Sequence, residues 1–334
     1  LITEVLTMSA GNQRLKILYL LKIFYEYTDD EHTLTINQII EKLKLYGISA
    51  ERKSLYSDIE ALRKFGLDIP DYEPETHGYY LGEREFQLTE LKLLIDIVQS
   101  SKFITEKKSL ELITKLTKLT SRELGKKLKT KIHISNRVKS MNENIYYNID
   151  KLYEAIDNDI QVSFRYFKYT PAKTKEFTHN GEKRFVNPVA LTFNNENYYL
   201  IAYNKQYKGF VHYRVDRMMD IELTDKLRIL PPKPFDVNEY EKTVFSMYGG
   251  SETNVEIEFH DSMANVVFDH FGRDIIIMPS KPGRFITRLK VSVSPTFLSW
   301  IIGFGDKAKV ISPQWVINEL FQMIDDFYRI YDQY

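Results

Sequence analysis

The spacing of apolar residues changes twice along the chain, and these changes limit the folds that it can adopt. Up to about residue 131, apolar residues recur at the three- and four-residue intervals of amphipathic helices. Short segments between residues 162 and 223 alternate instead between apolar and polar residues, as strands do. After residue 250, strand and helix patterns follow one another. For 334 residues, enough for two or three domains, this order predicts an α+β multidomain protein.

Three short helices are expected near the start of the chain, each with one apolar face. The residues of these faces are Ile17, Leu20, Leu21 and Phe24, then Ile36, Ile39, Ile40 and Leu43, then Leu55, Ile59, Leu62 and Phe65. Thr35 and Gln38 fit a capping box before the second helix, and Gly66 ends the third. Residues 67–70 and 78–81 are expected to form two short strands around a loop, which completes the outline of a winged helix-turn-helix.

The segment 86–131 is again helical in pattern, and it is locally basic. Between residues 102 and 139 lysine and arginine are frequent, whereas the acidic residues are only Glu106, Glu111 and Glu123. Such a charge run is most often the solvated face of a helix. The alternative is a linker that also contacts the DNA backbone.

Several short strands are expected after a helix at 148–158. They cover residues 162–166, 185–191, 198–203, 211–215 and 219–223, and this spacing is typical of a small β-barrel, here of the Sm/SH3-like kind. A proline-rich segment at 231–234 is expected to be a stiff linker. From residue 250 the order of patterns is β-α-β-β-α-β with a final helix at 313–331, which predicts a C-terminal ferredoxin-like α/β domain.

The third helix carries the residues most suited to contact DNA. In a helix-turn-helix the second helix of the motif enters the major groove, with its N-terminal residues at the base edges. The candidates are Arg52, Lys53, Ser54, Tyr56 and Ser57 at the start of this helix, with Arg63 further along for the phosphate backbone. The alternative is a surface helix with ordinary charges.

The charge of this region predicts weak DNA binding by a single copy. The whole chain has 46 Lys and Arg residues against 46 Asp and Glu residues, and residues 1–70 carry no net positive charge. Two copies on one duplex would raise the affinity. The sequence therefore favours a homodimer as the form that binds double-stranded DNA.

Several classes of protein are excluded by what the sequence lacks. Without cysteine there is no disulfide framework, thiol nucleophile or cysteine-ligated metal site, and the cytoplasm is the expected compartment. No apolar run approaches the roughly 18 residues that cross a bilayer, so no membrane segment is expected. The histidines show no His-x-x-x-His spacing and no Gly-x-Ser-x-Gly motif occurs, so we expect no enzyme and no cofactor or metal.

Several segments, in the right order, resemble those of bacterial WYL-domain transcriptional regulators. Residues 49–62 are similar to the recognition helix of that family, and residues 197–203 resemble its Trp-Tyr-Leu signature strand, with Tyr198 in place of the tryptophan. Residues 212–218 resemble the segment that faces the ligand. The other similar segments are 186–188, upstream of the signature, and 297–305 and 310–313, in the family's C-terminal WYL extension domain.

The resemblance implies an effector site on the barrel. The residues that would form it are Tyr166, Arg184, Tyr199, His212, Arg214 and Arg217. Guanidinium groups bind phosphate and aromatic rings stack on bases, so these residue types suit a nucleotide or a single-stranded nucleic acid. His212 stands where the family has arginine, so a permanent charge becomes a titratable one. From the residues alone, the alternative is an internal ion-pair cluster of Arg214, Asp216 and Arg217.

These observations give an expected organisation and function. Residues 12–82 would be the winged helix-turn-helix, 83–140 a helical linker, 141–232 the WYL-like barrel and 250–334 the ferredoxin-like extension. The expected function is a ligand-responsive, DNA-binding transcriptional regulator that senses a nucleotide or a nucleic-acid-like effector. The alternative is a nucleic-acid-binding accessory module that regulates an enzyme or a defence system by contact.

Overall fold

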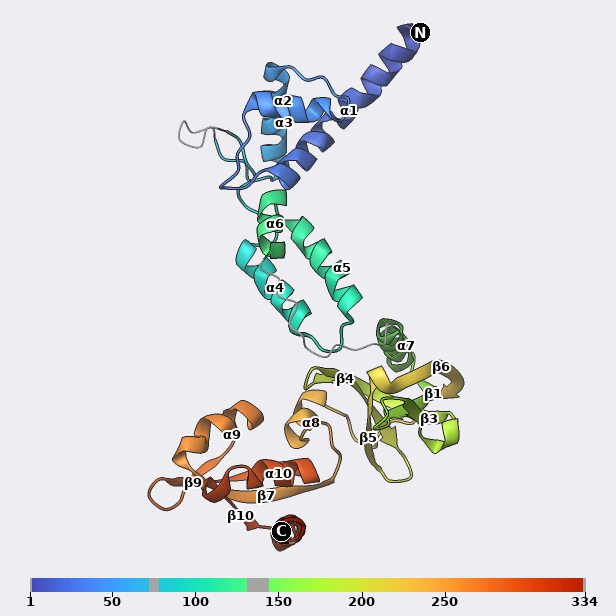
Figure 1. Ribbon diagram of the computed structural model, residues 1–334, viewed down its shortest axis with the longest axis vertical. Helices are drawn as coiled ribbons and strands as arrows, with labels where there is room; N and C mark the ends of the chain where they lie inside the picture. Colours follow the sequence, from blue (N-terminus) through green and yellow to red (C-terminus); the bar gives the residue numbers. More distant parts are fainter. Residues whose placement is uncertain (1, 72–77, 131–143, 333–334) are drawn as a thin grey trace. The chain divides into compact units, whose positions relative to one another are not determined.

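The computed structural model describes residues 2–71, 78–130 and 144–332, with side chains from residue 15 onward. The chain divides into two compact units, residues 1–141 and 142–334, and each is described by itself. The expected mixture of helices and antiparallel sheets is confirmed (Figure 1). The loop at 72–77 and the basic residues Lys131, Arg137 and Lys139 lie outside the described residues.

The three helices expected at the start of the chain are present. They are α1 (Ile2–Tyr27), α2 (Ile36–Lys44) and α3 (Arg52–Phe65). Their apolar faces meet in one core, in which Leu20, Ile39 and Leu55 are fully buried. Phe65, expected on the apolar face of the third helix, is instead 79% exposed at the end of α3 and lies outside this core. The capping box of Thr35 and Gln38 is confirmed. Gly66 ends α3 with φ +108°, a left-handed conformation that favours glycine over residues with a Cβ.

The two short strands expected after α3 are absent from the described residues, so this prediction was wrong. The backbone of the second segment forms its hydrogen bonds elsewhere: Tyr79 forms a single antiparallel bridge with Leu34, and the Leu81 N–H donates to Thr28 Oγ1 at 3.0 Å. In the first segment Pro70 has no N–H to donate to a ladder. The second segment is therefore held by Thr28 and Leu34. Just beyond it the chain is joined to the first segment, because Asp68 accepts from the Gly82 N–H at 2.9 Å and from the Glu83 N–H at 2.7 Å, but these bonds form no strand ladder among the described residues.

The helical run expected at 86–131 is divided into shorter helices. They are α4 (Leu88–Ser100), α5 (Glu106–Leu116), the 3-10 turn η1 (Thr117–Leu119) and α6 (Arg122–Thr130). Capping residues explain the breaks, because the Thr105 hydroxyl accepts from the Lys108 N–H at 3.2 Å and the Ser121 hydroxyl accepts from the Leu124 N–H at 3.2 Å. Leu91, Ile95, Ile113 and Leu128 form the small core of this segment.

The second unit begins with α7 (Ile145–Asp157) and a curled antiparallel sheet. Its strands are β1 (Ile160–Tyr169), β2 (Lys175–Phe177), β3 (Arg184–Asn194), β4 (Asn197–Asn204), β5 (Gly209–Arg214) and β6 (Met218–Leu227), with 3-10 turns η2 (His179–Gly181) and η3 (Val215–Arg217). The order is β2-β1-β3-β4-β5, and β6 also pairs with β1. The register of β3 against β4 shifts between Pro188 and Ala190, where proline cannot donate to the ladder. The expected strands 162–166, 185–191, 198–203 and 219–223 lie within β1, β3, β4 and β6, whereas the one expected at 211–215 ends one residue early, because Val215 begins η3. The strand β2 was not expected.

A connecting segment with α8 (Val237–Thr243) leads to a second sheet. The following elements are β7 (Ser251–His260), η4 (Asp261–Met263), α9 (Ala264–Phe271), β8 (Ile277–Pro279), β9 (Arg284–Val293), α10 (Pro295–Ile302), η5 (Gly305–Lys307), β10 (Ala308–Ser312) and α11 (Gln314–Tyr331). This is the expected succession, and the antiparallel sheet has the order β10-β7-β9-β8. A core of Val255, Ile257, Leu289, Val267 and Phe297 joins one face of the sheet to the helices.

None of the helices in the described parts of the chain combines the length and apolar character that a bilayer crossing requires.

Candidate nucleic-acid interface and effector site

The start of α3 presents most of the predicted DNA-contacting residues to solvent. Arg52, Lys53, Tyr56 and Ser57 are exposed, whereas Leu55 and Ile59 on the opposite side of the helix are buried in the core. Positions 52 and 56, and positions 53 and 57, are one helical turn apart, so the four residues share one outward surface. We call these four residues the α3 surface.

Ser54 does not belong to the α3 surface, because its side chain holds α3 against α1. The Lys16 ammonium group of α1 donates to Ser54 Oγ and forms an ion pair of 2.7 Å with Asp58 Oδ2. Lys16 is only 8% exposed, so this charge is buried together with its partners. The structure thus gives Ser54 a role in packing α3 on α1.

Arg63 is likewise occupied within the fold. Its Nε donates to the Ile69 carbonyl at 2.7 Å and its Nη2 donates to the Pro70 carbonyl at 2.6 Å. Nη1 lies 2.8 Å from the Asp71 carboxylate and also contacts Glu60. The guanidinium group therefore fastens the segment that follows α3.

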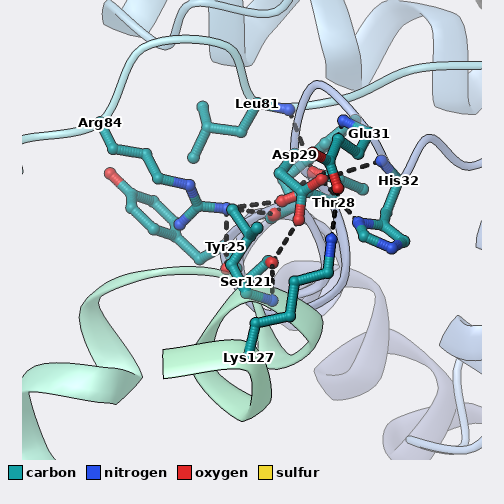
Figure 2. Close-up of polar contacts among 11 residues, drawn as sticks. Tyr25, Thr28, Asp29, Glu31, His32, Leu81, Arg84, Ser121 and Lys127 are labelled. Atoms are coloured by element: carbon teal, nitrogen blue, oxygen red, sulfur yellow. Dashed lines mark hydrogen bonds and ion pairs between the residues drawn. The ribbon is translucent and has the colours of Figure 1, made fainter. Parts of the chain in front are cut away.

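A buried carboxylate connects the N-terminal helices to the helical segment that follows them (Figure 2). Asp29, only 3% exposed, lies in the polar turn after α1. Its Oδ1 accepts from the Glu31 N–H at 2.9 Å and from the His32 N–H at 2.8 Å, and it lies 2.7 Å from His32 Nδ1. Its Oδ2 accepts from the hydroxyl of Ser121, the residue that caps α6. The hydrogen bond of Asp29 to Ser121 joins residues 92 positions apart in the sequence.

These donors decide the ionisation of Asp29. Burial alone would raise its pKa, but the hydrogen bonds from Ser121 and His32 and the charge of His32 hold the pKa below its ordinary value. The carboxylate is therefore ionised at neutral pH and remains bonded to donors of the turn and of α6.

Other charged groups complete this connection, which we call the α1–α6 joint. Arg84 donates through Nη2 to the carbonyls of Thr28 at 2.7 Å and of Tyr25 at 3.0 Å, near the C-terminal end of α1 (Figure 2). Arg122 and Lys127 of α6 bind the carboxylates of Glu26 and Glu31, respectively. The spacing of residues along the sequence does not predict the joint, since the only local signal is a run of polar residues at 28–32.

On the curled sheet of the second unit, one group of predicted effector residues gathers around Tyr166. The Tyr166 and Tyr213 ring centroids are 5.4 Å apart, and the Arg184 guanidinium carbon lies 5.9 Å from the Tyr166 centroid. Arg184 also donates to Thr178 Oγ1 at 2.9 Å. The Tyr166 hydroxyl accepts from the Arg214 N–H at 3.2 Å, which links this group to β5.

A second group lies at the end of β5. Arg214 donates to Asp216 from Nε at 3.0 Å and from Nη2 at 2.9 Å, and Nη2 also donates to Asn197 Oδ1 at 2.6 Å. For Arg214 and Asp216, the expected alternative of an internal ion pair is therefore observed. Arg217 differs, because its buried Nε has no acceptor among the described residues.

The positive charges of Arg214 and Arg217 act on both tyrosines that were predicted for the effector site. Burial raises the pKa of Tyr166 and of Tyr199 above the ordinary value, and the two guanidinium charges partly offset this rise. The structure therefore brings Tyr166, Tyr199, Arg214 and Arg217 together, with Arg184 beside Tyr166.

His212 is bonded to a residue outside this group. Its Nε2 lies 3.1 Å from the Tyr240 hydroxyl of α8. Burial lowers the pKa of His212 to about 4, although a backbone hydrogen bond with Met247 acts in the opposite direction. The imidazole is thus neutral at physiological pH, and the titratable charge expected in place of the family's arginine is not available near neutrality.

Two family models match the second unit. A WYL domain matches residues 147–223 and a WCX domain matches residues 251–327. The chain is a WYL-domain protein. The resemblance found at residues 197–203 and 212–218 is confirmed, since both segments lie inside the WYL match. Tyr166, Arg184, Tyr199, His212, Arg214 and Arg217 all lie inside it as well.

Among solved structures, the chain is similar to proteasome accessory factor B/C of Arthrobacter aurescens. The identity is 18% and the TM-score is 0.29, and the match covers 93% of this chain and 47% of that chain. The present chain thus spans about half the length of that protein. No match was found among the curated proteins.

The low pKa of His212 predicts how the stability of the WYL domain depends on pH. Between about pH 6.5 and pH 4 the unfolded chain binds a proton at this position and the folded chain does not. Stability is therefore lost as the pH falls through this range. We expect the His212→Gln variant, which retains a group able to bond Tyr240, to show a smaller fall in Tm between pH 7 and pH 5 than the unmodified protein. Equal falls in thermal scans of both proteins would contradict the assigned pKa.

Proposed function

We propose that this chain is a ligand-responsive, DNA-binding transcriptional regulator. The observation that carries the proposal is the α3 surface: Arg52, Lys53, Tyr56 and Ser57 face solvent at the N-terminal end of a helix whose other side is buried. This helix follows α2 as the second helix of a helix-turn-helix motif would. The WYL and WCX domains that follow support a regulator over an isolated DNA-binding module.

In this proposal residues 12–82 form a winged helix-turn-helix that binds double-stranded DNA. The α3 surface enters the major groove, where Arg52 donates two hydrogen bonds to a guanine and Lys53 binds a phosphate. Ser57 and Tyr56 supply hydroxyl donors beside them. Residues 83–140 then act as a helical linker, attached through the α1–α6 joint.

We infer that the working form is a homodimer. Residues 1–70 carry no net positive charge, so one copy would bind DNA weakly. Two copies on neighbouring half-sites would combine two weak contacts into stable binding. We assign dimerisation to the region 250–334, which we propose is ferredoxin-like.

The effector site is assigned to the group that contains Tyr166, Tyr199, Arg214 and Arg217, on a barrel that we propose is of the Sm/SH3-like kind. The buried Nε of Arg217 lacks an acceptor among the described residues. Leaving such a donor unbonded costs about 1–3 kcal/mol, which a phosphate oxygen from a ligand would recover. A nucleotide or a single-stranded nucleic acid supplies both that oxygen and a base that can stack on the tyrosines.

The mechanism is a shift between two arrangements of the paired DNA-binding domains. A ligand that binds one arrangement more tightly raises its population. The spacing of the two α3 surfaces then changes relative to the operator half-sites, and the affinity for DNA changes with it.

The proposal is tested by selecting genomic fragments that bind the purified protein. Recovery of a short palindrome supports a regulator that binds two half-sites. Recovery of fragments without a shared sequence contradicts it and favours the accessory module that acts by contact.

Substitution of each of the two arginines of the effector group is expected to give a different result. Arg217→Ala is expected to weaken binding of a short single-stranded oligonucleotide about tenfold or more in calorimetry without lowering Tm, because Arg217 Nε bonds no group of the described chain. Arg214→Ala is expected to lower both the affinity and Tm, because it removes the ion pair with Asp216 and the hydrogen bond to Asn197. Unchanged affinity in both variants would place the effector site elsewhere.

A further inference from the structure

A cleft of about 680 Å³ lies within the second unit. Three parts of the chain line it: Tyr203, Lys208 and Phe210 at β4 and β5, residues 231–243 of the connecting segment, and residues of the WCX domain on β7, on β9 and at the end of α9. None of the residues assigned above to the effector site lines this cleft. Its volume is within the range of cavities that hold small organic molecules.

One wall of the cleft is aromatic. The ring centroids of Phe210 and Phe235 are 4.7 Å apart, those of Phe210 and Tyr240 are 5.0 Å apart, and those of Phe235 and Tyr240 are 5.2 Å apart. The three rings therefore support one another in tilted and edge-to-face contacts. The prolines of the segment 231–234 extend this wall with a backbone of restricted flexibility. Because the rings and the proline backbone already hold one another in place, a flat apolar group could pack against this wall without the entropy cost of ordering flexible side chains.

The charges around the cleft leave two cations without an acidic partner. Glu252 forms an ion pair of 2.8 Å with Lys290, and Glu239 forms one of 2.7 Å with Lys242. The two remaining acidic residues of the lining, Asp236 and Asp274, also act on Lys242 and help to raise its pKa, after the larger effect of Glu239.

Asp236 has a further role, because its Oδ1 accepts from the first N–H groups of α8 at 2.9 and 3.2 Å. Arg288 binds Glu256 at 2.9 Å, outside the lining. Within the described parts of the chain, Lys208 and Lys233 are thus the lining cations with no ion pair. Both are exposed, so their charges are free to meet a ligand at the mouth of the cleft.

We propose that this cleft binds a small, flat organic anion. Its ring system packs against Phe210, Phe235 and Tyr240, and its carboxylate or phosphate group faces Lys208 and Lys233. This inference goes beyond the proposed function, because it assigns a second ligand site with its own residues. The cleft is lined by both the WYL domain and the WCX domain, so an occupant contacts both.

The experiment uses the full chain and a pair of probes that differ in charge alone. Binding of 2-naphthoate and of the neutral 2-naphthamide is measured by calorimetry and by ligand-observed NMR. Naphthoate is expected to bind more tightly than naphthamide. The Lys208→Gln and Lys233→Gln double variant is expected to weaken naphthoate binding about tenfold and to leave naphthamide binding unchanged, because only the charge contribution is removed.

The matched control is Lys226→Gln, which removes an exposed lysine of β6 that does not line the cleft. This variant is expected to bind both probes as the unmodified protein does. Phe235→Leu, which keeps an apolar side chain but removes a ring, is expected to weaken both probes. Equal affinity for the two probes, no binding of naphthoate at millimolar concentration, or an unchanged affinity in the double lysine variant would overturn the proposal. DNA binding of the unmodified protein and of each variant is measured separately. Failure to bind DNA would contradict the proposed function and would not bear on the binding of naphthoate in the cleft.

Discussion

Replacing Arg52 by alanine is expected to weaken binding to a selected operator fragment by about 1–3 kcal/mol, or roughly tenfold to a hundredfold. Arg52 is exposed at the first position of α3, so the variant loses a contact to DNA and none that holds the core. The measurement is a mobility-shift titration at fixed salt concentration, since phosphate contacts make the affinity depend on salt.

Two further variants separate a base contact from a phosphate contact. Lys53→Ala is expected to weaken binding to all sequences alike and to lower the slope of log affinity against log salt by about one. Lys226→Ala removes an exposed lysine of β6 and is expected to leave the titration unchanged. If Arg52→Ala binds the operator as tightly as the unmodified chain, the α3 surface does not contact bases.

Replacing Asp29 by alanine is expected to lower the free energy of unfolding of the first unit by about 3 kcal/mol. The change removes the acceptor of two backbone N–H groups and of the Ser121 hydroxyl, all in a place with little access to water. The donors that remain are partly unsatisfied, and unsatisfied buried donors are more costly than a lost surface contact. Urea denaturation followed by circular dichroism measures the effect, and hydrogen exchange locates it at the turn 28–32 and at α6.

The neighbouring residue provides the matched control. Asp30 is exposed, so Asp30→Ala keeps the joint and is expected to change the stability by less than about 0.5 kcal/mol. Equal stabilities of Asp29→Ala and Asp30→Ala would show that the α1–α6 joint does not hold the first unit together.

The joint also has an expected pH dependence. The pKa of Asp29 is lower in the folded chain than in the unfolded chain. The unfolded chain therefore takes up a proton first as the pH falls, and the stability that Asp29 contributes is present above its unfolded pKa and is lost as the pH falls through the folded value. In Asp29→Ala this part of the acid sensitivity should disappear.

The sequence by itself predicted the elements that depend on local spacing. The apolar faces of α2 and α3, the capping box of Thr35 and Gln38 and the turn at Gly66 follow from interactions within a few residues. The β-α-β-β-α-β succession after residue 250 was predicted for the same reason, because the period of apolar residues distinguishes a helix from a strand locally. The exposure of Arg52, Lys53, Tyr56 and Ser57 follows from their positions opposite Leu55 and Ile59.

Only the tertiary structure decided which groups meet. Arg63 has the appearance of a surface cation in the sequence, but its guanidinium is bonded to the carbonyls of Ile69 and Pro70. His212 shares a strand with Arg214, yet it faces Tyr240, 28 residues further along the chain. The bond between Asp29 and Ser121 spans 92 residues. Spacing along a helix or strand tells which way a side chain faces, whereas its partner, its burial and therefore its charge depend on segments that only folding brings near.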